Sequence, residues 1–198
     1  MGAFVLKLLE DRIRKEGQVR AGNVLKVDCF LNHQLDVRLL DAIGAEFYRQ
    51  FKDAGINKIL TIEASGIAIA VMAGLHLDVP VVFAKKAAAS NLGSDDIYTA
   101  KVHSFTKNTD CMLNVSSKYI SPDDRVLIID DFLAMGEAVS GLRAIINQAG
   151  ASLAGVGIAI EKDFQPGGKK LREEGIKLVS LAVVSLDENG DIAFKAYQ

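Results

Sequence analysis

The sequence has no tryptophan, three prolines, three histidines and two cysteines among its 198 residues. The cysteines, Cys29 and Cys111, have 81 residues between them and form no Cys-x-x-Cys motif. We therefore expect reduced thiols rather than the disulfide framework of a small secreted protein. The histidines are scattered without the spacing of a zinc site. There is also no proline-rich linker, internal repeat or low-complexity tract.

Long apolar runs and an excess of one charge are missing as well. The longest uncharged stretch, residues 144–160, has 17 residues and contains Asn147, Gln148 and Gly150, whereas a membrane-spanning helix needs about 20 apolar residues. The apolar N-terminus carries Lys7 and no small-residue cleavage site, so we expect no signal peptide, no membrane partner and a cytoplasmic location. The formal charge of −2 lacks the attraction of a sequence-independent nucleic-acid binder, so no nucleic-acid partner is expected.

The composition that is present, 49% hydrophobic and 24% charged residues, is typical of a globular protein. A length of 198 residues predicts a single domain over 1–198. Apolar residues at helical spacing predict helices at about 3–16 and 36–54, with Asp36 as the N-cap and Gly55 as the stop signal of the second.

Short runs rich in valine and isoleucine follow. They predict buried strands at 56–62, 79–83, 126–129, 153–160 and 176–186, with helical segments at about 66–77 and 136–149. Strands that alternate with helices are typical of an α/β fold with a largely parallel central sheet flanked by helices. Residues 85–120 are polar and break the alternation, and we interpret them as an inserted hairpin or a flexible flap.

Ligands of open parallel sheets bind beyond the carboxyl ends of the strands. Asp130 and Asp131 follow one run, and adjacent carboxylates suit vicinal hydroxyls or a divalent metal. The next helix is opened by small residues whose free amides would attract a phosphate. This loop contains Ala134, Met135, Gly136, Glu137 and Ala138, and a second such loop contains Glu63, Ala64, Ser65 and Gly66. Taken alone, the aspartates fit a helix cap equally well, and the second loop fits a tight turn.

Lysines follow two other apolar runs. Lys85 and Lys86 come after 79–83, and Lys162 comes after 153–160, preceded by Glu161. With Lys107 from the polar segment, they predict a locally basic site despite the net charge. No Ser/His/Asp or Cys/His arrangement for covalent catalysis is visible.

Together these segments resemble the type I phosphoribosyltransferases. The run Val126–Asp131 followed by Ala134–Ala138 looks like the motif of that family for phosphoribosyl pyrophosphate (PRPP). From about Leu25 to Val184 the chain more narrowly resembles the bacterial xanthine phosphoribosyltransferases. The matching segments are Val24–Asp28, Phe30–Gln34, Lys58–Glu63, Tyr98–Lys107 and Ile160–Gly167.

This resemblance implies transfer of a phosphoribosyl group from PRPP to xanthine, giving xanthosine 5′-monophosphate (XMP) and pyrophosphate. Asp130 and Asp131 would be the catalytic residues that face the ribose. Leu25, Asn32 and Lys162 would bind xanthine, 134–138 the 5′-phosphate and 63–66 the pyrophosphate. Mg²⁺ would arrive with PRPP, with the two aspartates as its candidate protein contacts. The family further implies a small hood (about 1–35 and 162–198), a flap (about 85–120) and a homodimer.

The chain also departs from the family. Met135 replaces a small polar residue, Glu137 an amide, Ala64 a serine and Ile69 a proline, which puts the turnover rate and the affinity for PRPP in question. A hypoxanthine/guanine-type enzyme is one alternative. A non-catalytic PRPP- or nucleotide-sensing regulator is another, although residues 1–24 are too few for an added DNA-binding domain. Asp130 and Asp131 alone would allow a phosphatase or receiver domain, which leaves the other matching segments unused.

Overall fold

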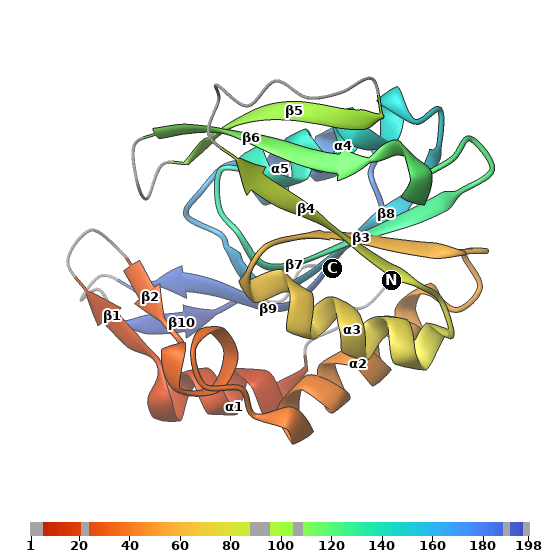
Figure 1. Cartoon of the computed structure of the whole chain (residues 1–198). Helices are drawn as coiled ribbons and strands as arrows, with labels where there is room; N and C mark the ends of the chain where they lie inside the picture. Colours follow the sequence, from red (N-terminus) through yellow and green to blue (C-terminus); the bar gives the residue numbers. More distant parts are fainter. Residues whose placement is uncertain (1–5, 21–23, 88–95, 105–108, 188–190, 196–198) are drawn as a thin grey trace.

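The computed structural model describes residues 6–20, 24–87, 96–104, 109–187 and 191–195. Most of their strands form one sheet of eight, in the order β10-β9-β8-β7-β3-β4-β6-β5 (Figure 1). Its parallel centre consists of β3 (Lys58–Ile62), β4 (Val81–Ala87), β7 (Arg125–Leu133), β8 (Ser152–Lys162) and β9 (Leu178–Leu186). The antiparallel strands are β5 (Ile97–Ser104), β6 (Thr109–Ser116) and β10 (Ile192–Phe194). The prediction of an α/β fold with a largely parallel sheet is confirmed.

Helices cover both faces of this sheet. The helices are α1 (Lys7–Glu16), α2 (Val37–Phe51), α3 (Ser65–Leu77), α4 (Glu137–Gln148) and α5 (Gly167–Glu173). Leu127 and Ile129 of β7 belong to the core beneath α1, α2 and α3, whereas Val126 and Ile128 belong to the core beneath α4 and α5. Successive strand residues point to opposite faces, so β7 supplies both cores. None of the described helices is long and apolar enough to cross a membrane.

A local signal accounts for the start of α2 but not for the hood segment before it. The Asp36 carboxylate accepts hydrogen bonds from the N–H groups of Arg38 and Leu39, both at 3.1 Å, as the prediction of an N-cap requires. Before α2, the chain forms a small sheet of β1 (Gln18–Arg20) and β2 (Val24–Lys26) and a π-helical turn, η1 (Asp28–Asn32). The sequence pattern predicts none of these three elements. The division into hood and core stays a prediction.

Several predicted boundaries are wrong because strand pairing extends the elements. β4 continues through Lys85 and Lys86, which pair with Asn114 and Leu113 of β6, so these lysines belong to the strand and do not follow it. β7 continues to Leu133 and likewise contains both aspartates of the candidate site. In contrast, α2 ends at Phe51 rather than at residue 54, before the turn that leads to Gly55 with its φ of +65°.

The polar segment 85–120 contains a hairpin, as expected, in which β5 pairs with β6. Residues 88–95 and 105–108 lie outside the described residues, and the role of a flap stays a prediction. The hairpin packs on α4, where a Cβ at Gly141 would come within 2.4 Å of Val102 Cγ1. The side-chain amide of Gln148 accepts from the Thr99 N–H at 3.1 Å and donates to the Thr99 carbonyl at 2.7 Å. These contacts fix β5, the outermost strand of the sheet, against α4.

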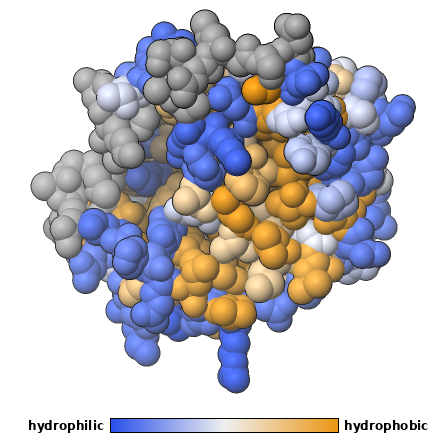
Figure 2. Space-filling model, in the orientation of Figure 1, coloured by the Kyte–Doolittle hydropathy of each residue, from blue (hydrophilic) through white to orange (hydrophobic). Residues whose placement is uncertain are grey.

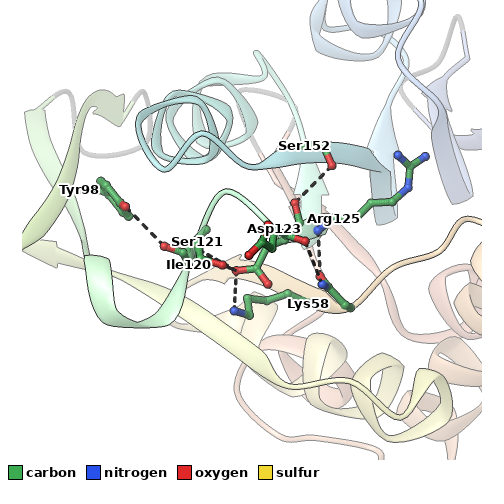
Figure 3. Close-up of polar contacts among 9 residues, drawn as sticks. Lys58, Tyr98, Ile120, Ser121, Asp123, Arg125 and Ser152 are labelled. Atoms are coloured by element: carbon green, nitrogen blue, oxygen red, sulfur yellow. Dashed lines mark hydrogen bonds and ion pairs between the residues drawn. The ribbon is translucent and has the colours of Figure 1, made fainter.

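A group of hydrogen-bonded residues, here called the amino-end cluster, lies where the central strands β3 and β7 begin. It consists of Lys58 and Ser121, both labelled in Figure 3, and Asp124. The Asp124 carboxylate accepts from Lys58 Nζ and from the Ser121 N–H, both at 2.7 Å. Burial on its own would raise the pKa of Asp124, but these hydrogen bonds and the Lys58 charge hold it below the usual value. Just before β7, the structure therefore satisfies a buried aspartate in its charged form.

Candidate active site

Asp130 and Asp131 lie near the carboxyl end of β7, in the centre of the sheet. Asp130 is 4% exposed, and its Oδ1 accepts a hydrogen bond of 3.0 Å from the Asp131 N–H. Burial, and then the negative charge of Asp131, raise the pKa of Asp130 well above its ordinary value. Asp131 is partly exposed. The pair thus offers one solvent-facing carboxylate and one buried carboxylate whose ionised form is disfavoured.

The loop after β7 leads into α4 and confirms the predicted strand-loop-helix arrangement. Residues 134–138 are all partly exposed, and Gly136 has a φ of +89°, a conformation that favours glycine. No side-chain hydrogen bond caps the start of α4. The first amides of such a helix, together with its dipole, form a binding site for an anion. The loop next to Asp131 therefore has an uncapped helix start, the local geometry that suits an anion.

The second predicted loop, 63–66, is brought up against Asp130. A Cβ at Gly66 would come within 2.8 Å of Asp130 Oδ1 and 2.4 Å of Thr61 Oγ1, so the small size of Gly66 allows α3 to start there. The Glu63 carboxylate accepts from the Lys86 N–H at 2.6 Å, and no side chain caps α3. A cis peptide joins Glu63 and Ala64. The two loops therefore open two uncapped helices on either side of Asp130.

Lys162 lies at the end of β8, beside β7. Its Nζ is 5.3 Å from the centre of the Phe132 ring, a favourable cation–π distance. Burial lowers the pKa of Lys162, while the charge of Asp131 opposes that shift. The lysine therefore belongs to the same group as the aspartates, with Phe132 as an aromatic neighbour that the sequence analysis does not identify.

The predicted gathering of lysines is only partly correct. Lys86 is close enough for its charge to favour the ionised form of Asp130. Lys85 instead lines a cavity of about 490 Å³ with Phe83 and Asn114, because adjacent strand residues point to opposite faces. Lys107 lies outside the described residues.

Leu25 and Asn32, the other two predicted base contacts, come from the segment before α2. Leu25 is 7% exposed and belongs to the same apolar cluster as Ile160, with Phe132 packed against that cluster. The Oδ1 atom of Asn32 is buried and has no hydrogen-bond partner among the described residues. The same holds for Oε1 of Gln165, three residues after Lys162. Gln165 is in the segment that carries the family resemblance, which is the signal that could have identified it.

The described residues contain no cluster of three or more His, Cys, Asp or Glu side chains that could hold a metal ion. The oxygen donors at this site are the two adjacent aspartates and Glu63. Carboxylate oxygens suit Mg²⁺, which commonly binds through one or two carboxylates and the phosphates of a substrate. The donor set therefore fits an ion that enters with a phosphorylated ligand, with the partly exposed Asp131 as the accessible protein contact.

The chain matches no model of a known protein family, but individual relatives match nearly all of it. Xanthine phosphoribosyltransferase 2 of Clostridium botulinum (strain Langeland) is 57% identical over 191 residues, which cover 96% of this chain and 100% of the relative. Xanthine phosphoribosyltransferase of Stutzerimonas stutzeri is 56% identical over 189 residues, 96% of this chain and 99% of the relative. The chain belongs to the xanthine phosphoribosyltransferase family. It is an α/β enzyme of the phosphoribosyltransferase class.

Among solved structures, adenine phosphoribosyltransferase of Trypanosoma brucei, in complex with AMP, pyrophosphate and ribose 5-phosphate, has a TM-score of 0.73. It is 20% identical, and the match covers 92% of this chain and 82% of that one. At this identity the likeness shows the fold alone.

Proposed function

We propose that this protein transfers the 5-phosphoribosyl group of PRPP to xanthine, giving XMP and pyrophosphate in purine salvage. One observation carries the proposal. An acidic pair, Asp130 and Asp131, is flanked by two small-residue loops that each open an uncapped helix. A diol between two phosphate groups matches this arrangement, and PRPP has a ribose diol between a 5′-phosphate and a pyrophosphate. Membership of the family supports the same choice.

The chain would hold PRPP at three points. The amides of 134–138 and the dipole of α4 bind the 5′-phosphate. Asp131 accepts hydrogen bonds from the ribose hydroxyls, and the loop 63–66 takes the pyrophosphate at the start of α3. Lys86 adds positive charge beside this loop. The hairpin segment 85–120 is the flap that would cover the bound sugar and exclude water.

The unpartnered Asn32 Oδ1 supports the assignment of the base site. A buried acceptor without a donor costs about 1–3 kcal/mol, and a purine N–H that donates to Oδ1 removes that cost when the base binds. Lys162 donates to a ring oxo group, with its Nζ over the Phe132 ring. Xanthine offers both groups, since it carries two oxo oxygens and ring N–H donors. Leu25 supplies apolar contact to the ring.

Transfer needs no covalent nucleophile, because positive charge develops at C1 of the ribose as pyrophosphate leaves. The two aspartates would stabilise that charge, chiefly through the partly exposed Asp131, and the two loops would orient the reacting groups. Mg²⁺, when bound with PRPP, offsets the charge of the leaving pyrophosphate. The protein contribution is therefore positioning, charge and exclusion of water.

The test is to incubate the protein with PRPP, Mg²⁺ and xanthine, hypoxanthine, guanine or adenine in turn, and to measure nucleotide and pyrophosphate. We expect xanthine to have the highest kcat/KM. Preference for hypoxanthine or guanine would replace the proposal with a hypoxanthine/guanine-type enzyme. PRPP binding without pyrophosphate release for any base would favour a regulator.

Substitution of Asn32 separates the base site from the PRPP site. Asn32→Ala removes the buried acceptor, so we expect the KM for xanthine to rise about tenfold, as for loss of one hydrogen bond to a buried partner, with the KM for PRPP within twofold. His33→Ala, at the exposed neighbouring position, is the matched control and should change neither constant. An equal rise of both constants in N32A would contradict a contact between Asn32 and the base.

We also propose that the protein is a homodimer in the cytoplasm. A hydrophobic area extends over α3 and β4 (Figure 2). Leu75 is 71% exposed and Tyr119 61% exposed, and two hollows on this face meet at Val81. A second copy would cover this area, since large exposed apolar patches mark association sites. Both cysteines are free, which agrees with a reducing compartment.

Sedimentation of the purified protein tests the dimer. Leu75→Glu places a charge in the apolar area, so we expect it to give a monomer. Val37→Glu changes an exposed valine at the start of α2 and should leave the dimer intact. A monomeric wild-type protein, or an L75E variant that remains dimeric, would contradict this interface.

A further inference from the structure

Glu161 is a buried carboxylate that the proposed chemistry does not use. It is 1% exposed and immediately precedes Lys162 on β8. Both of its oxygens are engaged by the Arg172 guanidinium of α5, each at 2.7 Å, and the Ser180 hydroxyl donates a further hydrogen bond. Such a two-pronged ion pair is strongly directional. It therefore fixes the position of α5 relative to the end of β8.

The N-terminal end of α5 rests on the phosphate loop. The Gly167 N–H donates to the Ala134 carbonyl at 3.0 Å. A Cβ at Gly167 would come within 2.4 Å of that carbonyl oxygen and 2.9 Å of the Gly136 nitrogen. A Cβ at Gly168 would lie 1.9 Å from Glu161 Oε1. The absence of side chains at both glycines thus allows α5 to touch the loop and the buried carboxylate at once.

These contacts connect β8, α5 and the loop after β7 in a closed series, here called the circuit. Leu133, the residue before the loop, pairs with Glu161 across β7 and β8. From Glu161 the circuit runs through Arg172 along α5 to Gly167 and back to the loop at Ala134. Because α5 has only seven residues, it is too short to be stable without tertiary contacts, and the ion pair is its most directional one.

We propose that the Glu161–Arg172 pair positions the 5′-phosphate loop relative to Lys162, and so aligns the phosphate of the sugar with the base. The proposal rests on the function proposed above. Glu161 and Arg172 are positioning residues that act through α5 and Lys162, and neither contacts the substrate. Loss of the pair loosens the loop, so the 5′-phosphate contributes less to the binding of a nucleotide whose base is in place.

The experiment compares the affinities of XMP and xanthosine, which differ only in the 5′-phosphate, by calorimetry. In the wild-type protein we expect XMP to bind far more tightly. Arg172→Lys keeps the positive charge but loses the bidentate hydrogen bonding of the guanidinium. It should reduce the ratio of XMP affinity to xanthosine affinity about threefold. Arg172→Met should reduce it at least tenfold. Xanthosine affinity should change by less than threefold in both variants.

Removal of Arg172 alone leaves a buried charge at Glu161 and can prevent folding. The double variant Glu161→Gln with Arg172→Met leaves no unpaired charge, and its ratio should also fall at least tenfold. The matched control is Glu174→Gln, which breaks the partly exposed Arg143–Glu174 pair between α4 and the end of α5. This variant should keep the wild-type ratio.

The outcomes separate this inference from the proposed function. If the wild-type protein binds XMP no better than xanthosine and forms no XMP from PRPP, the proposed function fails. If the wild-type protein passes both tests but the folded variants keep its ratio within twofold, the positioning role is overturned. Equal losses of affinity for XMP and xanthosine would also overturn it, because they indicate a merely structural role.

Discussion

A buried aspartate lies near each end of β7, and the neighbouring groups shift the pKa values of the two aspartates in opposite directions. Asp124, just before the strand, is matched by Lys58 and two donor groups of Ser121. Asp130, near the other end, has the like charge of Asp131 beside it. Burial, and then the charge of Asp131, raise the pKa of Asp130, whereas the hydrogen bonds and the Lys58 charge outweigh burial and lower the pKa of Asp124. The matched carboxylate of Asp124 stabilises the fold, whereas the ionised form of Asp130 is disfavoured beside the partly exposed Asp131, which is the carboxylate that a ligand can reach.

The largest effect is expected from a substitution at the carboxyl end of β7, where the substrate is proposed to bind. Asp131→Asn removes the charge that faces the ribose, so we expect kcat/KM for XMP formation to fall about 100-fold or more, in the range for loss of one preorganised electrostatic contact. The melting temperature should stay within about 3 °C of wild type, because like-charge repulsion with Asp130 is also removed. Nucleotide formation at the wild-type rate would refute the assignment of Asp131.

The reciprocal change is Asp124→Asn at the amino-end cluster. It leaves Lys58 buried without its partner, so we expect the free energy of unfolding to fall by about 3 kcal/mol, with a melting temperature lower by about 6–12 °C. At 25 °C the KM values should stay within twofold of wild type. Addition of Lys58→Met should restore part of the stability. A loss of activity without a loss of stability would contradict the division between the two ends.

The pH dependence of stability should have opposite signs at the two aspartates. A lowered pKa in the folded state means that Asp124 stabilises the fold above the ordinary aspartate pKa of about 3.9, and that this contribution is lost as pH falls through the lowered value. Asp130, with its raised pKa, costs stability increasingly as pH rises from about 3.9 to the raised value. The charge of Lys86 moderates that cost.

Urea unfolding between pH 3 and pH 8 in Mg²⁺-free buffer measures both effects. Relative to wild type, Asp124→Asn should lose the most stability at neutral pH and progressively less as pH falls below the ordinary aspartate pKa. Asp130→Asn should gain stability at pH 8 relative to pH 4. Parallel curves for the two variants would show that the two carboxylates titrate alike.

The smallest expected effect concerns Glu137, the first residue of α4. A carboxylate near the proposed phosphate raises the electrostatic energy of the bound phosphate by about 0.7 kcal/mol when water partly screens the two charges. Glu137→Gln should therefore lower the KM for PRPP roughly threefold, with the KM for xanthine unchanged. Glu173→Gln removes the same charge from an exposed site on α5 and is the control. An unchanged KM for PRPP in E137Q would indicate that Glu137 points away from the phosphate.

The sequence predicts the parallel strands well, because each buried strand is a short run of apolar residues between turn signals. It also predicts a site at Asp130, Asp131 and both loops, since they follow those apolar runs directly, and the structure brings these segments close together. The tertiary partners of such residues are not predicted, because they lie far apart in the sequence. The partner of Asp124 is Lys58, 66 residues away, and no local pattern joins them. Lys85 and Lys86 look equivalent in sequence, and only the pairing of β4 with β6 assigns them to opposite faces. Glu161 and Arg172 likewise meet only after α5 has packed.

The contact between Gln148 and Thr99 has a consequence for the solubility of the protein. β5 is the last strand of the sheet, and a free edge strand can template the addition of a strand from another chain. The amide of Gln148 occupies both backbone groups of Thr99 that point away from β6. It thereby imitates one rung of a neighbouring strand with a side chain that cannot propagate the sheet. A helix residue thus protects this edge against edge-to-edge aggregation.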